Sequence, residues 1–555
     1  MKTFFLAFAL SIGLCASCSK QTTTAAGDAP ADTSSLPDTV SAQAEEQQRE
    51  TPSSPSPWTQ HPCALRGANC TIPMQFPQDY TPLRPYPMLF FYPGCAPKET
   101  RSRIALLADA TPTPAVAAGW PQYTAAEAIL EHASNNLNTL PTRRFLVIPL
   151  TREGLLFACR HASFFNGLII RCFTNTSLSI SQAEAALLAN LARLPVFIDS
   201  SAIPEPPEIV RPLTRLLTQF GATHLAAPEF LFTESVDETQ ILQRALDFLC
   251  NSIQGQPERS FKWRARELKY SQAFWLKMTA FHLHGRTAMA EGEIKNDGIN
   301  GSAIRLSVTT TNLDGIAVRR DFPGLRKEAP LAITIDNQPL ILPKPAENSQ
   351  QPQWSYFQRD EATGKWRTIK GEAELAGRKN ALCEGPVGNL LRQPFAIVTA
   401  GLDETQAKAW TDAANAFAEK FGQLYGYTPP VVKDQDFLPE KFQGMPLLLF
   451  GGPEDNALSA ALLENDASFL PQLYRHLAAD LREAEALGCA TLHQGGFVAP
   501  GQMVLMVIGN SPKTLQTILR PFEKPEAFDE CDFLFFDAAK GQKLLQGFLD
   551  STWNP

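Results

Sequence analysis

Residues 143–154 read RRFLVIPLTREG: two arginines, a run of six apolar side chains, and then the polar start of a helix. A short apolar run of this kind is typical of a strand that is buried on both faces of a parallel sheet. Comparable runs, separated by helical patterns, lie at 87–94 (PMLFFYPG), 167–173 (GLIIRCF), 194–200 (LPVFIDS) and 222–229 (ATHLAAPE). Strands that alternate with helices predict a parallel α/β sheet, which we place in residues 61–265.

The helical segment that precedes this strand is expected to begin with a capping box formed by residues 124–127. Glu127 and Glu131 on that helix are interpreted as part of its solvent-facing side. Arg143 and Arg144, at the start of the strand, are likewise expected to face solvent.

Two further bodies are predicted after this sheet. Residues 266–385 alternate apolar and polar side chains between turns, which predicts an antiparallel β module. Residues 386–555 return to the α/β pattern, with a strand at 395–400 (FAIVTA) followed by a helix at 403–425 whose apolar residues keep helical spacing. The third body is expected to be a small doubly wound α/β domain.

Composition and charge narrow the function classes. The chain of 555 residues has a formal net charge of -8 and a pI near 5.6. Such a protein lacks the overall basic surface that phosphate contacts need, which argues against nucleic acid as a partner. No run of 18 apolar residues follows the N-terminus, so a polytopic membrane protein is excluded.

The N-terminus has the pattern of a secretory signal. Lys2 precedes an apolar stretch at 4–14 that is too short to span a bilayer. The triplet ASC at 16–18 resembles the lipobox of bacterial lipoproteins, although Cys15 stands where leucine is usual. We therefore predict a lipoprotein signal peptide at 1–18, lipidation of Cys18 and attachment to a lipid bilayer of a bacterial cell envelope. Ser19 in place of aspartate favours the outer membrane, and signal cleavage without a lipid is the alternative.

Residues 19–60 are rich in Ser, Thr and Pro and have few apolar side chains, so they are expected to form a disordered tether. Because secreted proteins experience oxidising conditions, Cys63 and Cys70 could form a disulfide across the short loop between them. The sequence leaves open whether this pair is oxidised.

Several strings in the second half of the chain share one resemblance. They are QAFWLKM (272–278), VTTTNL (308–313), WSYFQRD (354–360), KNALCEGPVGNLLRQPFAIVTAG (379–401), PLLLFGGPEDNAL (446–458) and VIGNSPKTL (507–515). Over residues 275–536 the chain resembles the C-terminal region of large secreted bacterial proteins whose N-terminal part is a prolyl-oligopeptidase-like or esterase-like α/β-hydrolase. The resemblance implies that residues 61–265 form an α/β-hydrolase-like domain. An active relative would need the nucleophile elbow G-x-S-x-G at the end of a strand.

The catalytic motifs that this resemblance implies are degenerate. Thr151 occupies the serine's place after the strand RRFLVIPL, and a β-branched residue is poorly suited to the positive φ of an elbow. The segment 227–233, where a general base would follow the last strand, has no histidine, and His224 precedes it. Asp199 is the only aspartate of the acid loop, and Pro93 has no backbone N–H to offer an oxyanion.

Three functions remain open from the sequence. The first is a cell-envelope lipoprotein with a catalytically degenerate hydrolase fold that binds or scaffolds, with a glycan or a peptide as possible ligand. The second is an active hydrolase with an atypical nucleophile, Thr151 or an unrecognised serine such as Ser163. The third is a purely structural envelope protein. No dinucleotide fingerprint, P-loop or third metal ligand beside His282 and His284 is found, so no cofactor and no metal are expected.

Overall fold

Residues 143–149 lie within the central strand of an eight-stranded sheet with the order β1-β2-β4-β3-β5-β6-β7-β8. Strands β3 to β8 are parallel, and β1 and β2 form an antiparallel hairpin at one end. The strands are β1 (Thr59–Leu65), β2 (Ala68–Gln75), β3 (Tyr86–Phe91), β4 (Leu106–Asp109), β5 (Thr139–Pro149), β6 (Gly167–Arg171), β7 (Val196–Asp199) and β8 (Leu225–Ala226). Strand β4 lies between β2 and β3, and β2 pairs with it in antiparallel orientation.

The computed structural model describes most of the chain after residue 58, and all described residues belong to the unit Pro55–Pro555. The described residues are 59–65, 68–76, 81, 83–96, 106–109, 122–173, 180–201, 210–226, 238–252, 259–297, 303–322, 325, 331–342, 353–402, 404–425, 427–464, 466–477, 487–496, 498–499, 501–509 and 528–555. The predicted signal peptide, Cys18 and nearly all of the predicted tether lie outside them.

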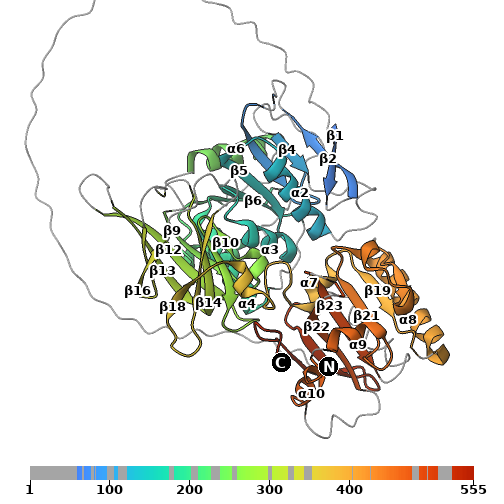
Figure 1. The fold of residues 1–555 in the computed structure, drawn as a ribbon. Coiled ribbons are helices and arrows are strands. Elements are labelled where there is room, and N and C mark those ends of the chain that lie inside the picture. Colours follow the sequence, from blue (N-terminus) through green and yellow to red (C-terminus); the bar gives the residue numbers. More distant parts are fainter. Residues whose placement is uncertain are drawn as a thin grey trace, which may run out of the picture. The chain divides into compact units, whose positions relative to one another are not determined.

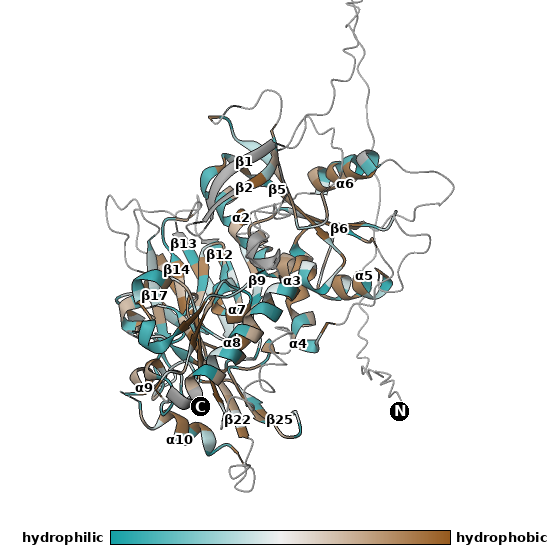
Figure 2. Ribbon diagram, turned by 90° about the vertical axis from the view of Figure 1, so that its right-hand side faces the viewer, coloured by the Kyte–Doolittle hydropathy of each residue, from teal (hydrophilic) through white to brown (hydrophobic). Residues whose placement is uncertain are grey.

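Helices cover both faces of the first sheet (Figure 1). The helices are α2 (Gln122–Asn136), α3 (Arg152–His161), α4 (Gln182–Ala185), the 3₁₀ helix η1 (Ala186–Arg193), α5 (Val210–Gln219) and α6 (Glu238–Ser252). On one face, Phe91 and Val147 pack against Ala245 of α6. On the other, alternate side chains such as Phe90 and Ile148 share a core with α2, α3 and α5. Figure 2 shows the resulting alternation of hydrophobic and hydrophilic residues along α5 and α6.

The second body consists of two five-stranded sheets with the orders β10-β11-β14-β17-β18 and β16-β15-β13-β12-β9. Its elements are β9 (Ser260–Ala265), η2 (Leu268–Tyr270), β10 (Gln272–Ala273), β11 (Leu276–Phe281), β12 (Ala288–Asp297), β13 (Ala303–Thr311), β14 (Leu313–Arg319), β15 (Leu331–Ile335), β16 (Gln338–Leu342), β17 (Trp354–Arg359), β18 (Trp366–Ile369) and η3 (Glu372–Leu375). All pairings are antiparallel except that of β13 with β15. Strand β9 precedes the predicted boundary at 265 and pairs with β12.

The third body contains a seven-stranded sheet with the order β20-β19-β21-β23-β22-β24-β25. Its elements are α7 (Val387–Leu391), β19 (Ala396–Thr399), α8 (Glu404–Tyr425), β20 (Val431–Lys433), η4 (Asp434–Asp436), η5 (Pro439–Phe442), β21 (Leu447–Phe450), α9 (Ala457–Leu463), α10 (Phe469–Tyr474), β22 (Leu487–Gln494), β23 (Met503–Gly509), β24 (Phe533–Asp537) and β25 (Gln542–Gly547). Strands β20, β19, β21 and β23 are parallel, and the remaining pairings are antiparallel. Buried Trp410, Ala414 and Phe421 line the inner side of α8.

The predicted fold class, an α/β-hydrolase-like sheet followed by a β module and a small α/β domain, is confirmed. The predicted capping box is wrong, because α2 already begins at Gln122 and residues 124–127 lie inside it. Among the described residues, no helix is long and apolar enough to cross a membrane.

Candidate functional site

The junction between β5 and α3, where an elbow would expose a nucleophile, has the geometry of an ordinary helix cap. Thr151 is the N-cap of α3 in an extended conformation, with φ -125° and ψ 163°. Its hydroxyl oxygen accepts a hydrogen bond from the backbone N–H of Gly154 at 3.1 Å. No residue from 149 to 154 has a positive φ. The hydroxyl of Thr151 therefore serves the first turn of the helix.

Gly154 keeps the steric role of an elbow glycine. A Cβ atom at this position would lie 2.6 Å from the carbonyl oxygen of Pro149, so only glycine lets the helix start this close to the strand end. In G-x-S-x-G the nucleophile stands two residues before the second glycine. Counted back from Gly154, that place falls on Arg152, so the placement of Thr151 at the serine's position is one residue too early when Gly154 is taken as the second glycine.

Arg152 is neutralised by carboxylates from two other parts of the chain. Its guanidinium pairs with Glu184 and, at 3.0 Å, with Oδ2 of Asp529, which also pairs with Arg392. Burial alone would lower the pKa of Arg152, but the hydrogen bonds from its guanidinium to Glu184 and Asp529 raise it above its usual value. A permanently charged, paired guanidinium cannot act as a nucleophile.

The structure also describes Asp199 and His224, two further positions considered for the catalytic residues. Asp199 ends β7 and pairs with Arg171 of β6, with 3.2 Å between Arg171 Nε and Asp199 Oδ2. Its other oxygen accepts a hydrogen bond from the Ser201 hydroxyl at 2.6 Å. His224 lies just before β8, at the amino end of the strand, whereas a catalytic base follows the carboxyl end. Residues 227–233 lie outside the described part of the chain.

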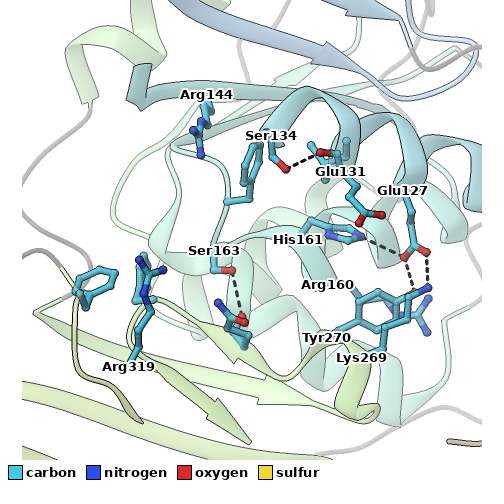
Figure 3. Close-up of a pocket in the computed structure, with 15 residues that line it drawn as sticks. Glu127, Glu131, Ser134, Arg144, Arg160, His161, Ser163, Lys269, Tyr270 and Arg319 are labelled. Carbon is cyan, nitrogen blue, oxygen red and sulfur yellow. Dashed lines mark hydrogen bonds and ion pairs between the residues drawn. The ribbon is translucent and has the colours of Figure 1, made fainter. Parts of the chain in front are cut away.

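A pocket of about 520 Å³ lies at the opposite end of α3. The ten-residue helix spans about 15 Å, and it leads from Arg152 beside the strand ends to His161 in the pocket wall. Figure 3 shows Arg144, Ser163 and Arg319 toward one side of the pocket and His161 and Glu127 toward the other. Its wall thus combines α2, the C-terminal end of α3, the segment around η2 and the end of β14.

Glu127 is the centre of a hydrogen-bonded cluster in this pocket. It is buried, and its carboxylate lies 2.5 Å from the Lys269 ammonium, 2.5 Å from the Tyr270 hydroxyl and 3.3 Å from Nε2 of His161. Burial alone would raise the pKa of Glu127, but the positive charge of Lys269 and the hydrogen bond with His161 lower it well below its usual value of 4.5. Glu127 is therefore an ionised hydrogen-bond acceptor across the physiological pH range.

A second buried carboxylate, Glu384, lies close to this cluster, and its pKa is raised where that of Glu127 is lowered. Glu384 is buried and accepts hydrogen bonds from the backbone N–H groups of Leu268 and Lys269, both at 2.6 Å. Burial, together with the nearby charge of Glu267, raises the pKa of Glu384 to about 8. An adjoining pocket of about 310 Å³ is lined by both Glu127 and Glu384.

Two interpretations made from the sequence are wrong. Glu127 is buried and paired rather than solvent-facing, while Glu131, one turn later, is exposed as expected. Arg143 is exposed, but Arg144 is half-buried and lines the pocket. No local pattern could reveal this difference, because the groups that bond Glu127 come from α3, 34 residues further along the chain, and from η2, more than a hundred residues further along.

Two other sites considered from the sequence are the disulfide between Cys63 and Cys70 and the histidine pair His282 and His284. Strands β1 and β2 place Cys63 directly opposite Cys70 in the antiparallel ladder. Opposite Cα atoms are about 4.5–5.5 Å apart in such ladders, within the range that a disulfide bridges, so the pairing stays a prediction. His282 and His284 follow the end of β11 rather than alternating along it. In the described ranges, no group of three or more His, Cys, Asp or Glu side chains could hold a metal ion.

Comparison with known proteins gives limited similarity. No family model matches the chain, and no curated protein sequence matches it. Solved structures that align with it include a thermostable esterase (14% identity, TM-score 0.26, 35% of this chain and 62% of that chain) and Porphyromonas gingivalis dipeptidyl peptidase 4 (14%, 0.28, 36% and 36%). Butyrate-bound esterase 2 of Thermogutta terrifontis aligns at 14% identity and TM-score 0.22, over 34% of this chain and 90% of that one. The chain covers less than two thirds of the first two proteins, and its fold class rests on its own strand order.

Proposed function

We propose that this protein is a ligand-binding protein of the bacterial cell envelope, built on an α/β-hydrolase-like sheet that does not hydrolyse substrates at the usual elbow. The single observation that carries the proposal is the junction of β5 and α3. There Thr151, whose backbone is extended, is the N-cap of α3. The neighbouring Arg152 forms ion pairs with Glu184 and Asp529. The pocket around Glu127 then offers the place for a ligand.

The pocket supports a binding role through its shape and polarity. Its volume of about 520 Å³ falls within the range of small-molecule sites. Aromatic rings and convergent polar groups line it together, which is the composition that orients a ligand. The hydrogen bonds among Glu127, Lys269 and Tyr270 hold part of this wall in a fixed geometry before a ligand arrives.

Loss of the Thr151 hydroxyl is expected to affect stability and not turnover. Thr151→Ala removes the N-cap hydrogen bond to Gly154 and should lower the free energy of unfolding by about 1 kcal/mol. Wild type and variant are to be compared by urea denaturation and with a panel of chromogenic acyl esters and prolyl peptides. Thr223→Ala, in an exposed position before β8, is the control for the loss of a threonine. Turnover that disappears only in Thr151→Ala would overturn the proposal.

A second candidate function, hydrolysis at a different site, is favoured by one observation. Ser163, His161 and Glu127 line the same pocket, and Glu127 bonds the imidazole. Against it, the Ser163 hydroxyl donates to the carbonyl of Gln272 at 3.3 Å. The same panel with Ser163→Ala separates the two functions: turnover that Ser163→Ala abolishes and Thr151→Ala leaves intact would establish a hydrolase in the pocket.

The proposed location follows from the N-terminal sequence. We propose that a lipid on Cys18 attaches the protein to the outer membrane and that residues 19–60 serve as the tether. A Cys18→Ser variant expressed in a bacterium should leave the membrane fraction and should no longer incorporate labelled palmitate. A variant that still incorporates the label would contradict lipidation at this cysteine.

A further inference from the structure

We propose that the pocket binds an acidic saccharide, whose carboxylate is held by Arg144 and Arg319 and whose hydroxyl groups bond the polar wall. This inference rests on the proposed binding function and specifies the chemical class of its ligand. Four of the lining side chains are cationic (Arg144, Arg160, Lys269 and Arg319), whereas two are carboxylates (Glu127 and Glu131). A surplus of positive charge in one pocket of a protein with a net charge of -8 favours an anionic ligand.

The cations of the pocket differ in how far the protein already neutralises them. Lys269 pairs with Glu127, and Arg160 pairs with Glu267. Arg319 has an ion pair through its Nε only, with 3.3 Å to Asp321. Arg144 has no carboxylate partner among the described residues: its Nε donates to the Thr139 hydroxyl at 3.0 Å. Arg144 is thus the cation that a ligand carboxylate would neutralise.

Arg144 is held in a position from which its two Nη groups can bind a carboxylate end-on, because its Nε already donates to Thr139. Its guanidinium lies 4.3 Å from the centroid of the Phe164 ring. Stacking on an aromatic face leaves the edge of the guanidinium plane, with its N–H groups, available for bidentate bonding. Burial lowers the pKa of Arg144, which is the expected effect when a cation is taken out of water without a paired anion. A bound carboxylate would remove that cost.

The rest of the lining matches a sugar better than an extended peptide. Ser134, Ser163 and Gln272 are neutral hydrogen-bonding groups of the kind that bond hydroxyls. Phe274 and Phe322 add aromatic surface for the C–H face of a sugar ring, and the guanidinium groups of Arg193 and Arg319 lie 4.8 and 5.8 Å from the centroids of these rings. A peptide bound by strand addition would need an exposed sheet edge, but the edge strand at this pocket, β10, has only two residues.

The test is a calorimetric titration of the purified full-length chain in detergent with galacturonic acid oligosaccharides and, as the matched neutral ligands, galactose oligosaccharides. Arg144→Gln is compared with Arg143→Gln, which removes the same charge from the adjacent, exposed position. A charge-assisted hydrogen bond of typical strength corresponds to an affinity loss of about 10- to 100-fold. We expect this loss for the acidic sugar in Arg144→Gln, none in Arg143→Gln, and weak binding of the neutral sugar throughout.

Further measurements keep the inference open to contradiction. Arg144→Lys retains the charge without the bidentate geometry and should fall between wild type and Arg144→Gln. Melting temperatures of all variants show whether folding is preserved, and Arg319→Gln serves if Arg144→Gln does not fold. Equal affinity for acidic and neutral sugars, no binding of either, or preferential binding of an acidic peptide would each overturn the saccharide assignment. These results would leave the proposed binding function intact. That function would be overturned only by the turnover of an ester or a peptide.

Discussion

Replacement of Lys379 by methionine is expected to lower the free energy of unfolding of the C-terminal body by about 3–5 kcal/mol. The Lys379 ammonium lies 2.5 Å from Oδ2 of Asp532 and donates to the carbonyl of Leu549 at 2.6 Å. Both charged side chains are fully buried. Methionine has a similar length and fills the same space, but it leaves the Asp532 carboxylate buried without its counter-charge.

The matched control is Lys408→Met. Lys408 forms the same kind of contact, 2.6 Å to Asp412, but its side chain is 84% exposed. Water solvates both partners there, so the variant should change the free energy of unfolding by no more than about 0.5 kcal/mol. Urea denaturation, followed by the tryptophan fluorescence of the protein, to which Trp553 beside the Lys379 ammonium contributes, measures both variants. A loss below about 1 kcal/mol in Lys379→Met would show that the pair is not buried in solution.

The double variant Lys379→Met/Asp532→Leu separates the charge from the packing. Replacement of a buried ion pair by apolar residues is often neutral or stabilising, because it also removes the cost of taking both charges out of water. We expect the double variant to regain most of the stability that Lys379→Met loses. A double variant as unstable as the sum of the single losses would indicate that the packing, and not the charge pair, determines the effect.

The fold could be predicted because its strands are signalled locally. The apolar runs at 87–94, 143–150, 167–173 and 194–200 each became a strand of the first sheet within a few residues of the expected bounds. A strand that is buried on both faces of a sheet requires such an apolar run, so the run in the sequence directly predicts the buried strand in the structure. The turn at Asp336 and Asn337, both with positive φ, follows the same rule, because Asp and Asn tolerate this conformation.

The site could not be predicted to the same extent, because burial of a charge depends on partners that are distant in sequence. Glu127 and Glu131 lie one turn apart on α2 and are indistinguishable by local pattern. Lys269 and Tyr270 approach only the first of them. The degenerate elbow, in contrast, was inferred from residue types at one junction and stays a prediction. At that junction Thr151 has an extended backbone, which suits a β-branched residue.

The second large effect is expected for Glu127→Gln, which should lower the free energy of unfolding by about 3 kcal/mol near pH 7. The carboxylate accepts from Lys269, Tyr270 and His161, and an amide would turn its own N–H groups toward one of these donors. Glu131→Gln, one turn later and exposed, removes the same charge from the same helix and should stay within about 0.5 kcal/mol of wild type.

The pH dependence of this difference identifies its origin. The folded protein holds the pKa of Glu127 below 4.5, so the carboxylate contributes its full stability above about pH 4.5 and loses it as pH falls further. The difference in free energy of unfolding between wild type and Glu127→Gln should therefore become smaller as pH falls below 4.5. Glu384 affects stability over a different pH range. Because its pKa is raised to about 8 in the folded protein, the free energy of unfolding should fall as pH increases from 4.5 to 8, in wild type and variant alike. Urea denaturation from pH 3 to pH 9 distinguishes the effects of the two carboxylates. If the difference in free energy of unfolding between wild type and Glu127→Gln stays constant from pH 7 down to pH 3, an ionised, hydrogen-bonded Glu127 would be contradicted.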